Sequence, residues 1–367
     1  MSYYDEKRIE EEQMKRAYKI FSLLLCMLML FCSVTKAEVS ATDTASEDVR
    51  VASRFWELLF KEKKNGKEQT EKTRPTLIAS GDLFGLRLKT DGVIVVSVDR
   101  PEYGILCEGD ILLSLDGEKL NCAEDLKAKL DGKDEVELTL LRRGKTEHKK
   151  HPVENNTLGI TVRDSALGIG TVTYINPDTG AFGGLGHGIT EGTSGALIPI
   201  IGGDVTDVTL GGVTKGAEGK PGELCGVLRH NDKGDIQIND SCGVFGILDT
   251  PTSATPIPIA YRGEVREGDA TVLCTVRQGK TLSYNIKIRD IDFSSTTNKC
   301  FLVEVTDPAL LAITGGIVRG MSGSPIIQDG KLVGAVTHVL INDPSVGYGI
   351  FIENMLNAAE NTVPKAA

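Results

Sequence analysis

The chain has few aromatic residues and no excess of positive charge. Aromatic side chains make up 5% of its 367 residues, and the formal net charge at pH 7 is −10. General binding of nucleic acid requires a basic surface, so this charge argues against nucleic-acid partners. We expect proteins or peptides as partners instead.

Cysteine is present but shows no pattern of a metal or redox site. Two of the eight cysteines lie in an apolar N-terminal stretch, and the other six are scattered without a C-x-x-C pair. Structural zinc sites and thioredoxin-like sites need closely spaced cysteines. The sequence therefore predicts no metal site, no cofactor and no catalytic cysteine.

The longest apolar run is short for a transmembrane helix. Residues 20–34 are apolar and follow Lys15, Arg16 and Lys19. A spanning helix needs about 20 apolar residues, and a signal-peptide core about 7–15. Residues 1–37 thus predict export, through a cleaved signal peptide or an uncleaved anchor. The long charged prefix favours an anchor that tethers the chain to the membrane. Either reading places the chain after residue 38 outside the cytoplasm.

Glycine is abundant and separates short β-branched runs. This pattern, with 41 glycines, predicts a mostly β protein. Residues 38–75 are polar and charged and are expected to form a linker with one short helix at about 51–60. From residue 158 onward, the pattern predicts one barrel-rich domain or a pair of packed barrels. The expected strands are 168–175, 196–201, 243–248, 270–276, 282–288, 301–305, 326–327 and 333–339, with a final helix at 352–359.

Residues 76–153 are expected to form a separate compact domain. Strands at 92–98 and 136–142 and a helix at 123–130 surround the run Gly-Asp-Ile-Leu-Leu-Ser-Leu-Asp-Gly at 109–117. This run resembles that of bacterial PDZ domains. Such domains bind an extended peptide as an added strand, with loop amides that hold a carboxylate. The resemblance places that loop at Leu83, Phe84, Gly85 and Leu86. A small αβ module without a ligand is the alternative.

The segment Gly-Met-Ser-Gly-Ser-Pro at 320–325 resembles the nucleophile region of chymotrypsin-like serine peptidases, as does the strand pair that follows it. Glycines allow a tight turn that presents one hydroxyl group and leaves amides free to face an oxyanion. We expect Ser322 to be the nucleophile, with Ser324 as the alternative. The amides of Gly320 and Ser322 would form the oxyanion hole. The alternative is that the segment is an ordinary glycine-rich turn with no catalytic function.

A serine nucleophile needs a base, and histidine has the pKa that suits this role. Among five histidines, His148, His151 and His230 are expected to be exposed. His187 lies in a glycine-rich loop and is the best candidate base, with His338 as its competitor. Residue types alone do not select the carboxylate that orients the base. The candidates between His187 and Ser322 are Asp235, Asp240, Asp249, Asp292 and Asp307.

The export segment, the predicted PDZ domain and the stretches 174–189 and 305–349 together resemble the stage IV sporulation protein B family, the PDZ-containing serine peptidases of endospore formers. The resemblance covers nearly all of the chain after residue 76. It implies that Ser322 is the nucleophile, that His187 is the general base and that Asp307 orients the base. It also implies that Thr337 supports the site.

The sequence thus predicts a mostly β chain in which a PDZ domain at 76–153 precedes a chymotrypsin-like, β-barrel-type serine peptidase domain at 154–367. The resemblance implies an exported endopeptidase that cleaves itself and a regulatory membrane protein between the two forespore membranes. That cleavage leads to processing of a mother-cell sigma factor. The PDZ domain is expected to bind the chain's own N-terminal region or the target.

Two other functions remain open from the sequence. One is a non-catalytic PDZ adaptor with a peptidase-like domain, in which His187 and Ser322 would lie far apart. The other is a chaperone-protease of loose specificity that degrades misfolded proteins.

Overall fold

The computed structural model describes residues 74–249, 254–277 and 279–361. The predicted export segment and nearly all of the linker lie outside the described residues. Within the described part, no helix is long and apolar enough to cross a membrane.

The first barrel consists of six strands whose antiparallel pairings form a ring. Around the ring, each strand pairs with the next, and the last, β9, pairs with β2. Phe84, Phe182 and Val205 are buried in its core. The strands in ring order are β2 (Leu83–Val98), β7 (Ile160–Ile175), β8 (Ala181–Gly184), β11 (Gly243–Leu248), β10 (Glu223–Asp240) and β9 (Ile200–Thr214). The short strands β1 (Thr76–Ala79) and β12 (Ile257–Pro258) extend the sheet from β7.

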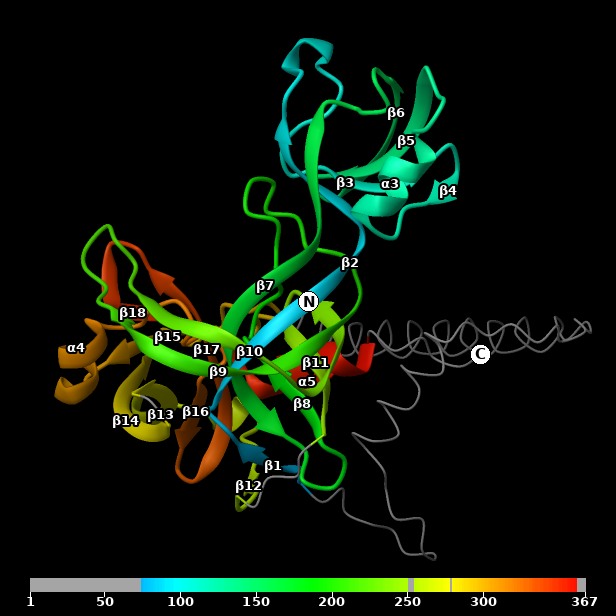
Figure 1. The fold of residues 1–367 in the computed structure, drawn as a ribbon. Coiled ribbons are helices and arrows are strands. Elements are labelled where there is room, and N and C mark those ends of the chain that lie inside the picture. Colours follow the sequence, from blue (N-terminus) through cyan, green and yellow to red (C-terminus); the bar gives the residue numbers. More distant parts are fainter. Residues whose placement is uncertain (1–73, 250–253, 278, 362–367) are drawn as a thin grey trace, which may run out of the picture. The chain divides into compact units, whose positions relative to one another are not determined.

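The second barrel is also closed by six strands (Figure 1). Its core contains Val272, Ile326 and Val336 together with Tyr174 and Phe245 from the first barrel, so the two barrels pack against each other. In ring order the strands are β13 (Gly268–Arg277), β14 (Lys280–Arg289), β15 (Phe301–Val305), β18 (Asp343–Phe351), β17 (Lys331–Leu340) and β16 (Pro325–Gln328). The helices are η2 (Arg262–Glu264), α4 (Pro308–Thr314) and α5 (Ile352–Asn361).

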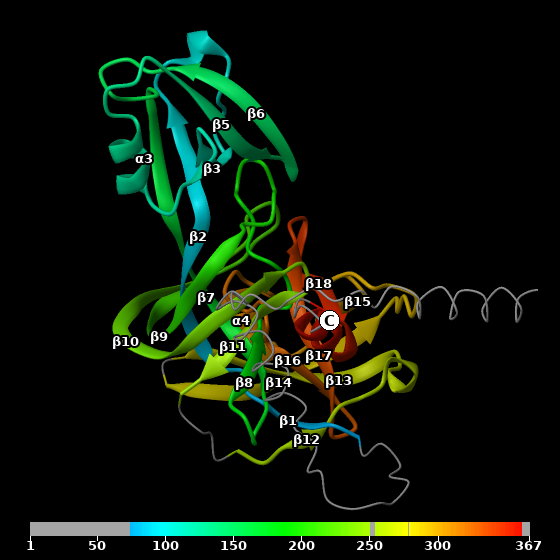
Figure 2. The same cartoon turned by 90° about the vertical axis from the view of Figure 1, so that its right-hand side faces the viewer.

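Residues 93–163, which we call the inserted unit, have a core of their own. Val93, Leu112, Leu126 and Leu138 are buried in it. β2 and β7 pair twice, through 83–89 with 165–171 in the barrel and through 94–98 with 160–163 in the inserted unit (Figure 2). The other elements are η1 (Pro101–Tyr103), β3 (Ile111–Leu115), β4 (Glu118–Lys119), α3 (Ala123–Lys129), β5 (Glu135–Arg142) and β6 (Lys145–Pro152).

The start of the inserted unit differs from the predicted boundary at residue 76. β1 and the first half of β2 pair with barrel strands. Leu83, Phe84, Gly85 and Leu86 all lie in β2, and Gly85 has partners on both sides, Ile169 and Thr206. Their amides face neighbouring strands, and Phe84 and Leu86 are core residues. The structure therefore corrects their predicted role as the loop that holds a peptide carboxylate.

The mostly β architecture is confirmed, and most apolar strands lie where the sequence predicts them. The structure differs from the predictions at two elements and at one histidine. His230 lies in β10 rather than in a loop, and the predicted strand at 196–201 begins only at Ile200. His151 was expected to be exposed but is 2% exposed, with its ring against Tyr103.

A buried ion pair inside the inserted unit gives a test of this fold. Asp110 is 1% exposed, and its carboxylate accepts hydrogen bonds from the Cys107 amide and from Arg142 at 2.6 and 2.8 Å. Asp110→Asn removes the buried charge partner of the guanidinium and leaves only Glu147, at 3.6 Å, so we expect a loss of about 3 kcal/mol in the free energy of unfolding. Urea denaturation measures this loss. The exposed pair of Glu118 and Lys129 is the control. Glu118→Gln should cost much less, because solvent screens this pair, and equal losses would contradict the prediction.

Candidate active site

The turn that carries Ser322 belongs to the second barrel but is held by a strand of the first. On β7, the Thr171 hydroxyl donates to the Gly320 carbonyl at 2.8 Å, and the Thr171 amide donates to the Ser322 carbonyl at 3.0 Å. The Thr173 hydroxyl, which is fully buried, donates to the Gly323 carbonyl at 2.7 Å. These bonds fix the turn between the two barrels.

Gly323 is required for this close approach. Its φ is +96°, and a Cβ atom there would lie 2.0 Å from the Thr171 carbonyl oxygen. Any other side chain would clash with the strand that anchors the turn, and it would also be strained by the backbone conformation. The close approach of Thr171 therefore explains why the motif has glycine at position 323.

The Ser322 hydroxyl donates a 2.8 Å hydrogen bond to the Thr337 carbonyl. The pairing of β17 with β18 shifts register between Val336 and His338, as in a β-bulge. At a bulge, the extra residue does not form the regular hydrogen bonds between the strands. The Thr337 hydroxyl instead donates to the carbonyls of Asn298, at 2.8 Å, and Tyr348, at 3.2 Å. Thr337 thus contacts Ser322, the predicted nucleophile, through its backbone rather than its side chain.

Ser324, the alternative nucleophile, lies inside the protein. Its side chain is fully buried, and its hydroxyl has no hydrogen-bond partner among the described residues. Ser322 is partly exposed. A nucleophile must reach the substrate, so burial argues for Ser322 and against Ser324.

Two backbone amides beside Ser322 are available to an oxyanion. The amides of Met321, Gly323 and Ser324 donate to Val318, Val336 and Met321 carbonyls, respectively. The amides of Gly320 and Ser322 donate no hydrogen bond to any residue in the described ranges. These are the two donors that the motif predicts for the oxyanion hole.

His187 lies on the loop after β8, which packs onto the strand of Thr337. Gly186 before it has a φ of +68°, and a Cβ atom there would lie 2.9 Å from the Thr337 side chain. Nδ1 of His187 lies 2.9 Å from the Gly188 carbonyl. A carbonyl only accepts, so Nδ1 carries the proton and Nε2 has the lone pair that a base needs. Burial lowers the pKa of His187, which keeps this lone pair free.

His338, the competitor for the role of base, also lies at the site. Its ring centroid is 4.9 Å from that of His187, with the planes tilted by 38°. Burial lowers the pKa of His338 to about 4, and the nearby His187 and Lys299 contribute. Both imidazoles are therefore neutral near pH 7.

Asp307 lies at the N-terminus of α4. Its carboxylate accepts hydrogen bonds from the amides of Ala309 at 2.9 Å, Leu310 at 3.2 Å and Asn285 at 3.2 Å. Although desolvation opposes the shift, these amides lower the pKa of Asp307. No hydrogen bond joins Asp307 to His187, whose Nδ1 pairs with Gly188. The structure thus brings Ser322, His187 and Thr337 together but gives Asp307 the geometry of a helix cap.

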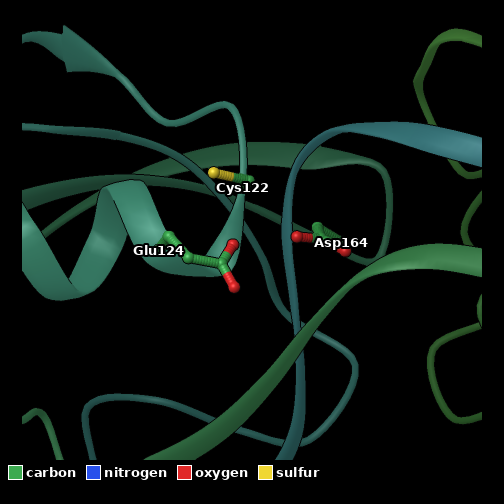
Figure 3. A group of neighbouring side chains, drawn as sticks. All are labelled: Cys122, Glu124 and Asp164. Atoms are coloured by element: carbon green, nitrogen blue, oxygen red, sulfur yellow. The ribbon is translucent and has the colours of Figure 1, made fainter.

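One group of side chains in the described part could hold a metal ion, although no metal site was expected. Cys122, Glu124 and Asp164 place ligand atoms within 4.8 Å of one another (Figure 3). Asp164 already accepts a hydrogen bond from the Ala123 amide at 3.1 Å. The group lies where α3 begins in the inserted unit, whereas Ser322 belongs to the second barrel.

The model of the SpoIVB peptidase S55 family matches residues 154–356, more than half of the chain. The chain belongs to the SpoIVB peptidase S55 family. It is a serine peptidase, and the matched range contains His187, Asp307 and Ser322. The predicted family is thereby confirmed.

Solved structures show limited likeness to this SpoIVB-family peptidase. The active form of the Rv3671c protease from M. tuberculosis is 14% identical and has a TM-score of 0.29, over 55% of this chain and 76% of that one. The PDZ domain of an SdrC-like protein (Lmo2051) from Listeria monocytogenes is 24% identical, with a TM-score of 0.18, over 20% of this chain and 87% of that one. No curated protein matches the chain.

Sequence reasoning missed the two threonines that anchor the turn. Thr171 and Thr173 lie two residues apart in the predicted strand 168–175, so their side chains share one face. This two-residue spacing was the feature of the sequence that could have indicated a shared role for the two threonines. It did not reveal the partners, because Gly320 is 149 residues away from Thr171.

Thr173→Val tests the anchor, because valine has nearly the same shape as threonine and no hydroxyl. The Gly323 carbonyl then loses a buried donor, so we expect a loss of about 1–3 kcal/mol in the free energy of unfolding. We also expect slower labelling of Ser322 by a fluorophosphonate probe. Thr209→Val, at an exposed hydroxyl on β9, is the matched control. A Thr173→Val protein as stable and as reactive as the unmodified chain would contradict the anchor.

Because His187 and His338 are buried, we expect the labelling rate and the stability of the protein to change with pH in a defined way. Labelling of Ser322 requires neutral His187, whose lowered pKa should keep the reaction going below pH 6.5. The folded-state pKa of His338 is about 4, against about 6.5 when unfolded. Its contribution to stability is therefore complete above pH 6.5 and is lost as the pH falls through about 4.

Labelling rate and thermal midpoint, both recorded from pH 4 to 8, measure these effects. His230→Gln, at an exposed position, should leave both profiles unchanged. A labelling midpoint above pH 6.5 would contradict the assignment of a buried, neutral base.

Proposed function

We propose that this serine peptidase is an exported, membrane-tethered signalling enzyme that cleaves itself and a membrane-bound regulator. The observation that supports it best is the Ser322 hydroxyl beside two free amides, on a turn that lies against the His187 loop. The family name links it to sporulation, and the apolar segment at 20–34 supports export. The space between the forespore membranes is the proposed location, and processing of a mother-cell sigma factor is the proposed outcome.

In this mechanism Ser322 attacks the scissile carbonyl while Nε2 of His187 takes its proton. The amides of Gly320 and Ser322 bind the oxyanion. His187 then returns the proton to the leaving amine, and water attacks the acyl-enzyme by the reverse route. The Ser322 hydroxyl now faces the Thr337 carbonyl, so it must first rotate toward His187. In this proposal, the hydrogen bond from Ser322 to Thr337 belongs to a resting state.

The inserted unit is proposed to bind a peptide along β7 rather than at Leu83 to Leu86. Residues 160–163 of β7 pair with β2 on one side, and no other described strand pairs with them. An extended peptide can add to such an edge. The occupant is the chain's own N-terminal region or the target protein.

A contact between the inserted unit and the His187 loop supports control of cleavage by that peptide. Glu191 is 6% exposed, and its carboxylate accepts hydrogen bonds from the amides of Thr193 and Ser194. A Cβ atom on Gly109, in the inserted unit, would lie 2.4 Å from this carboxylate. A shift of the inserted unit would therefore press on the loop that begins at His187.

The adaptor hypothesis fits these contacts less well. It places His187 and Ser322 far apart, yet a Cβ atom on Gly323 would lie 2.5 Å from the Leu185 amide of the His187 loop. Free oxyanion donors also have no use in an adaptor.

Self-cleavage of the purified full-length chain tests the proposal. Ser322→Ala removes the nucleophile, and we expect self-cleavage to stop. Ser324→Ala, which alters the buried hydroxyl two residues away, is the matched control and should still be cleaved. Gel electrophoresis with mass spectrometry of the products records both. Self-cleavage of Ser322→Ala at the unmodified rate would overturn the assignment.

A further inference from the structure

The end of the hairpin formed by β9 and β10 lies against the segment that leads from α4 to Ser322. We call this end, residues 214–224, the arm. The Gly216 amide of the arm donates to the Thr314 carbonyl at 2.8 Å. A Cβ atom on Gly315 would lie 2.3 Å from the Gly216 carbonyl oxygen, so the two backbones are in close contact. A hairpin of the first barrel thus reaches the chain just before the nucleophile turn.

Two hydrogen bonds connect the arm to Arg319. The Arg319 amide donates to the Gly222 carbonyl at 2.9 Å, and the Leu224 amide donates to the Arg319 carbonyl at 2.9 Å. Glu223 and Arg319 therefore pair as neighbouring residues do in a parallel sheet. Leu224 is buried, which shields this pairing from water.

The bond from Leu224 sets the orientation of the peptide between Arg319 and Gly320. In a trans peptide, the carbonyl and the amide that follows it point in opposite directions. The Arg319 carbonyl points toward the arm, so the Gly320 amide points away from it. A peptide rotated by half a turn would present a carbonyl oxygen in place of the amide, and such an oxygen would repel an oxyanion.

The two predicted oxyanion donors are held in different ways. The peptide before Ser322 is held inside the turn, because the Met321 carbonyl accepts from the Ser324 amide at 2.9 Å. The peptide before Gly320 is held from outside the turn, by Leu224 of the arm. Glycine gives this peptide more freedom to rotate than any other residue would. An oxyanion hole needs donors that are oriented before the reaction, so the contact with the arm has a chemical consequence.

We propose that the arm is the positioning element of the oxyanion hole, and that Gly222 and Leu224 hold the Arg319–Gly320 peptide with its amide toward the reacting carbonyl. The inference rests on the proposed function, in which the amides of Gly320 and Ser322 bind the oxyanion. It assigns the orientation of one donor to the first barrel, whereas the donor itself belongs to the second.

Three glycines of the hairpin allow a graded test. None of them has a φ in the left-handed range, so the available space decides the effect of alanine. A Cβ atom on Gly222 would lie 2.3 Å from the Thr214 carbonyl oxygen, on the other side of the arm. One on Gly216 would lie 3.2 Å from the Pro344 side chain, which is a milder contact. One on Gly212 would have nothing within 4 Å.

The rate at which a fluorophosphonate probe labels the purified full-length chain measures the effect. Gly222→Ala forces the two sides of the arm apart and disturbs both bonds to Arg319. We expect the rate constant to fall by about tenfold to a hundredfold, because the Gly320 donor is then only partly aligned. Gly216→Ala should lower the rate less. Gly212→Ala is the matched control and should react at the unmodified rate. Thermal midpoints show that each variant is folded during the reaction.

The Gly320 amide provides a signal that a general loss of stability would not change. Isotopic enrichment of arginine carbonyl carbons and glycine nitrogens selects, by nuclear magnetic resonance, the amides of glycines that follow arginine. These are Gly144, Gly263 and Gly320. Once the probe has reacted, the Gly320 proton resonance should move downfield, because the amide then donates to the phosphonyl oxygen. In fully reacted Gly222→Ala this shift should be reduced or lost, and in Gly212→Ala it should be complete.

Several results would reject the arm as a positioning element. One is a folded Gly222→Ala protein that reacts at the unmodified rate. Another is a slow Gly222→Ala protein that keeps the complete Gly320 shift, because the loss would then have another cause. A third is an equal loss in Gly212→Ala. If Gly222→Ala does not fold, Gly216→Ala decides, and the unmodified rate in that variant rejects the arm.

The same experiments separate failure of this inference from failure of the proposed function. If Ser322→Ala reacts as fast as the unmodified chain, the mechanism at Ser322 fails. If the Gly320 resonance of the unmodified chain does not move after the reaction, the proposed oxyanion hole fails. If that resonance moves but the arm variants behave as the unmodified chain does, only the role of the arm fails.

Discussion

The hydrogen bonds from β7 to the turn at 320–323 are the constraint on which the active site depends. The hydroxyls of Thr171 and Thr173 belong to the first barrel, and the carbonyls that accept them belong to the second. They engage carbonyls of the turn, while the amides of Gly320 and Ser322 donate to no residue that the structure describes. An oxyanion hole needs such preorganised donors, because they then stabilise developing charge without rearrangement.

The same strand connects the catalytic turn to the inserted unit. β7 begins at Ile160, where one edge pairs with no described strand, and reaches the turn eleven residues later at Thr171. Glu191 against Gly109 provides a second connection, through the loop of His187. Under the proposed function, a peptide bound to the inserted unit would thus act on elements that end at Ser322 and at the loop of His187.

Both predicted catalytic groups form hydrogen bonds to backbone carbonyls in this structure. The Ser322 hydroxyl faces Thr337, and Nδ1–H of His187 faces Gly188. The β-bulge at Thr337 makes its carbonyl available and sets His338 against the base. One local irregularity in β17 therefore provides both the acceptor for the Ser322 hydroxyl and the ring that lies against His187.

The sequence by itself predicted the chemistry, because the glycine-rich turn around Ser322, the loop of His187 and the apolar strands are local patterns. It also indicated the family. Tertiary structure decided which polar groups meet. It placed Leu83 to Leu86 in a barrel strand. In the sequence the two halves of β2 are separate apolar runs, but in the structure one strand contains both. It made Asp307 a helix cap and brought Thr171 to Gly320 across 149 residues. Such pairings depend on closure of the barrels, for which no local residue pattern is a signal.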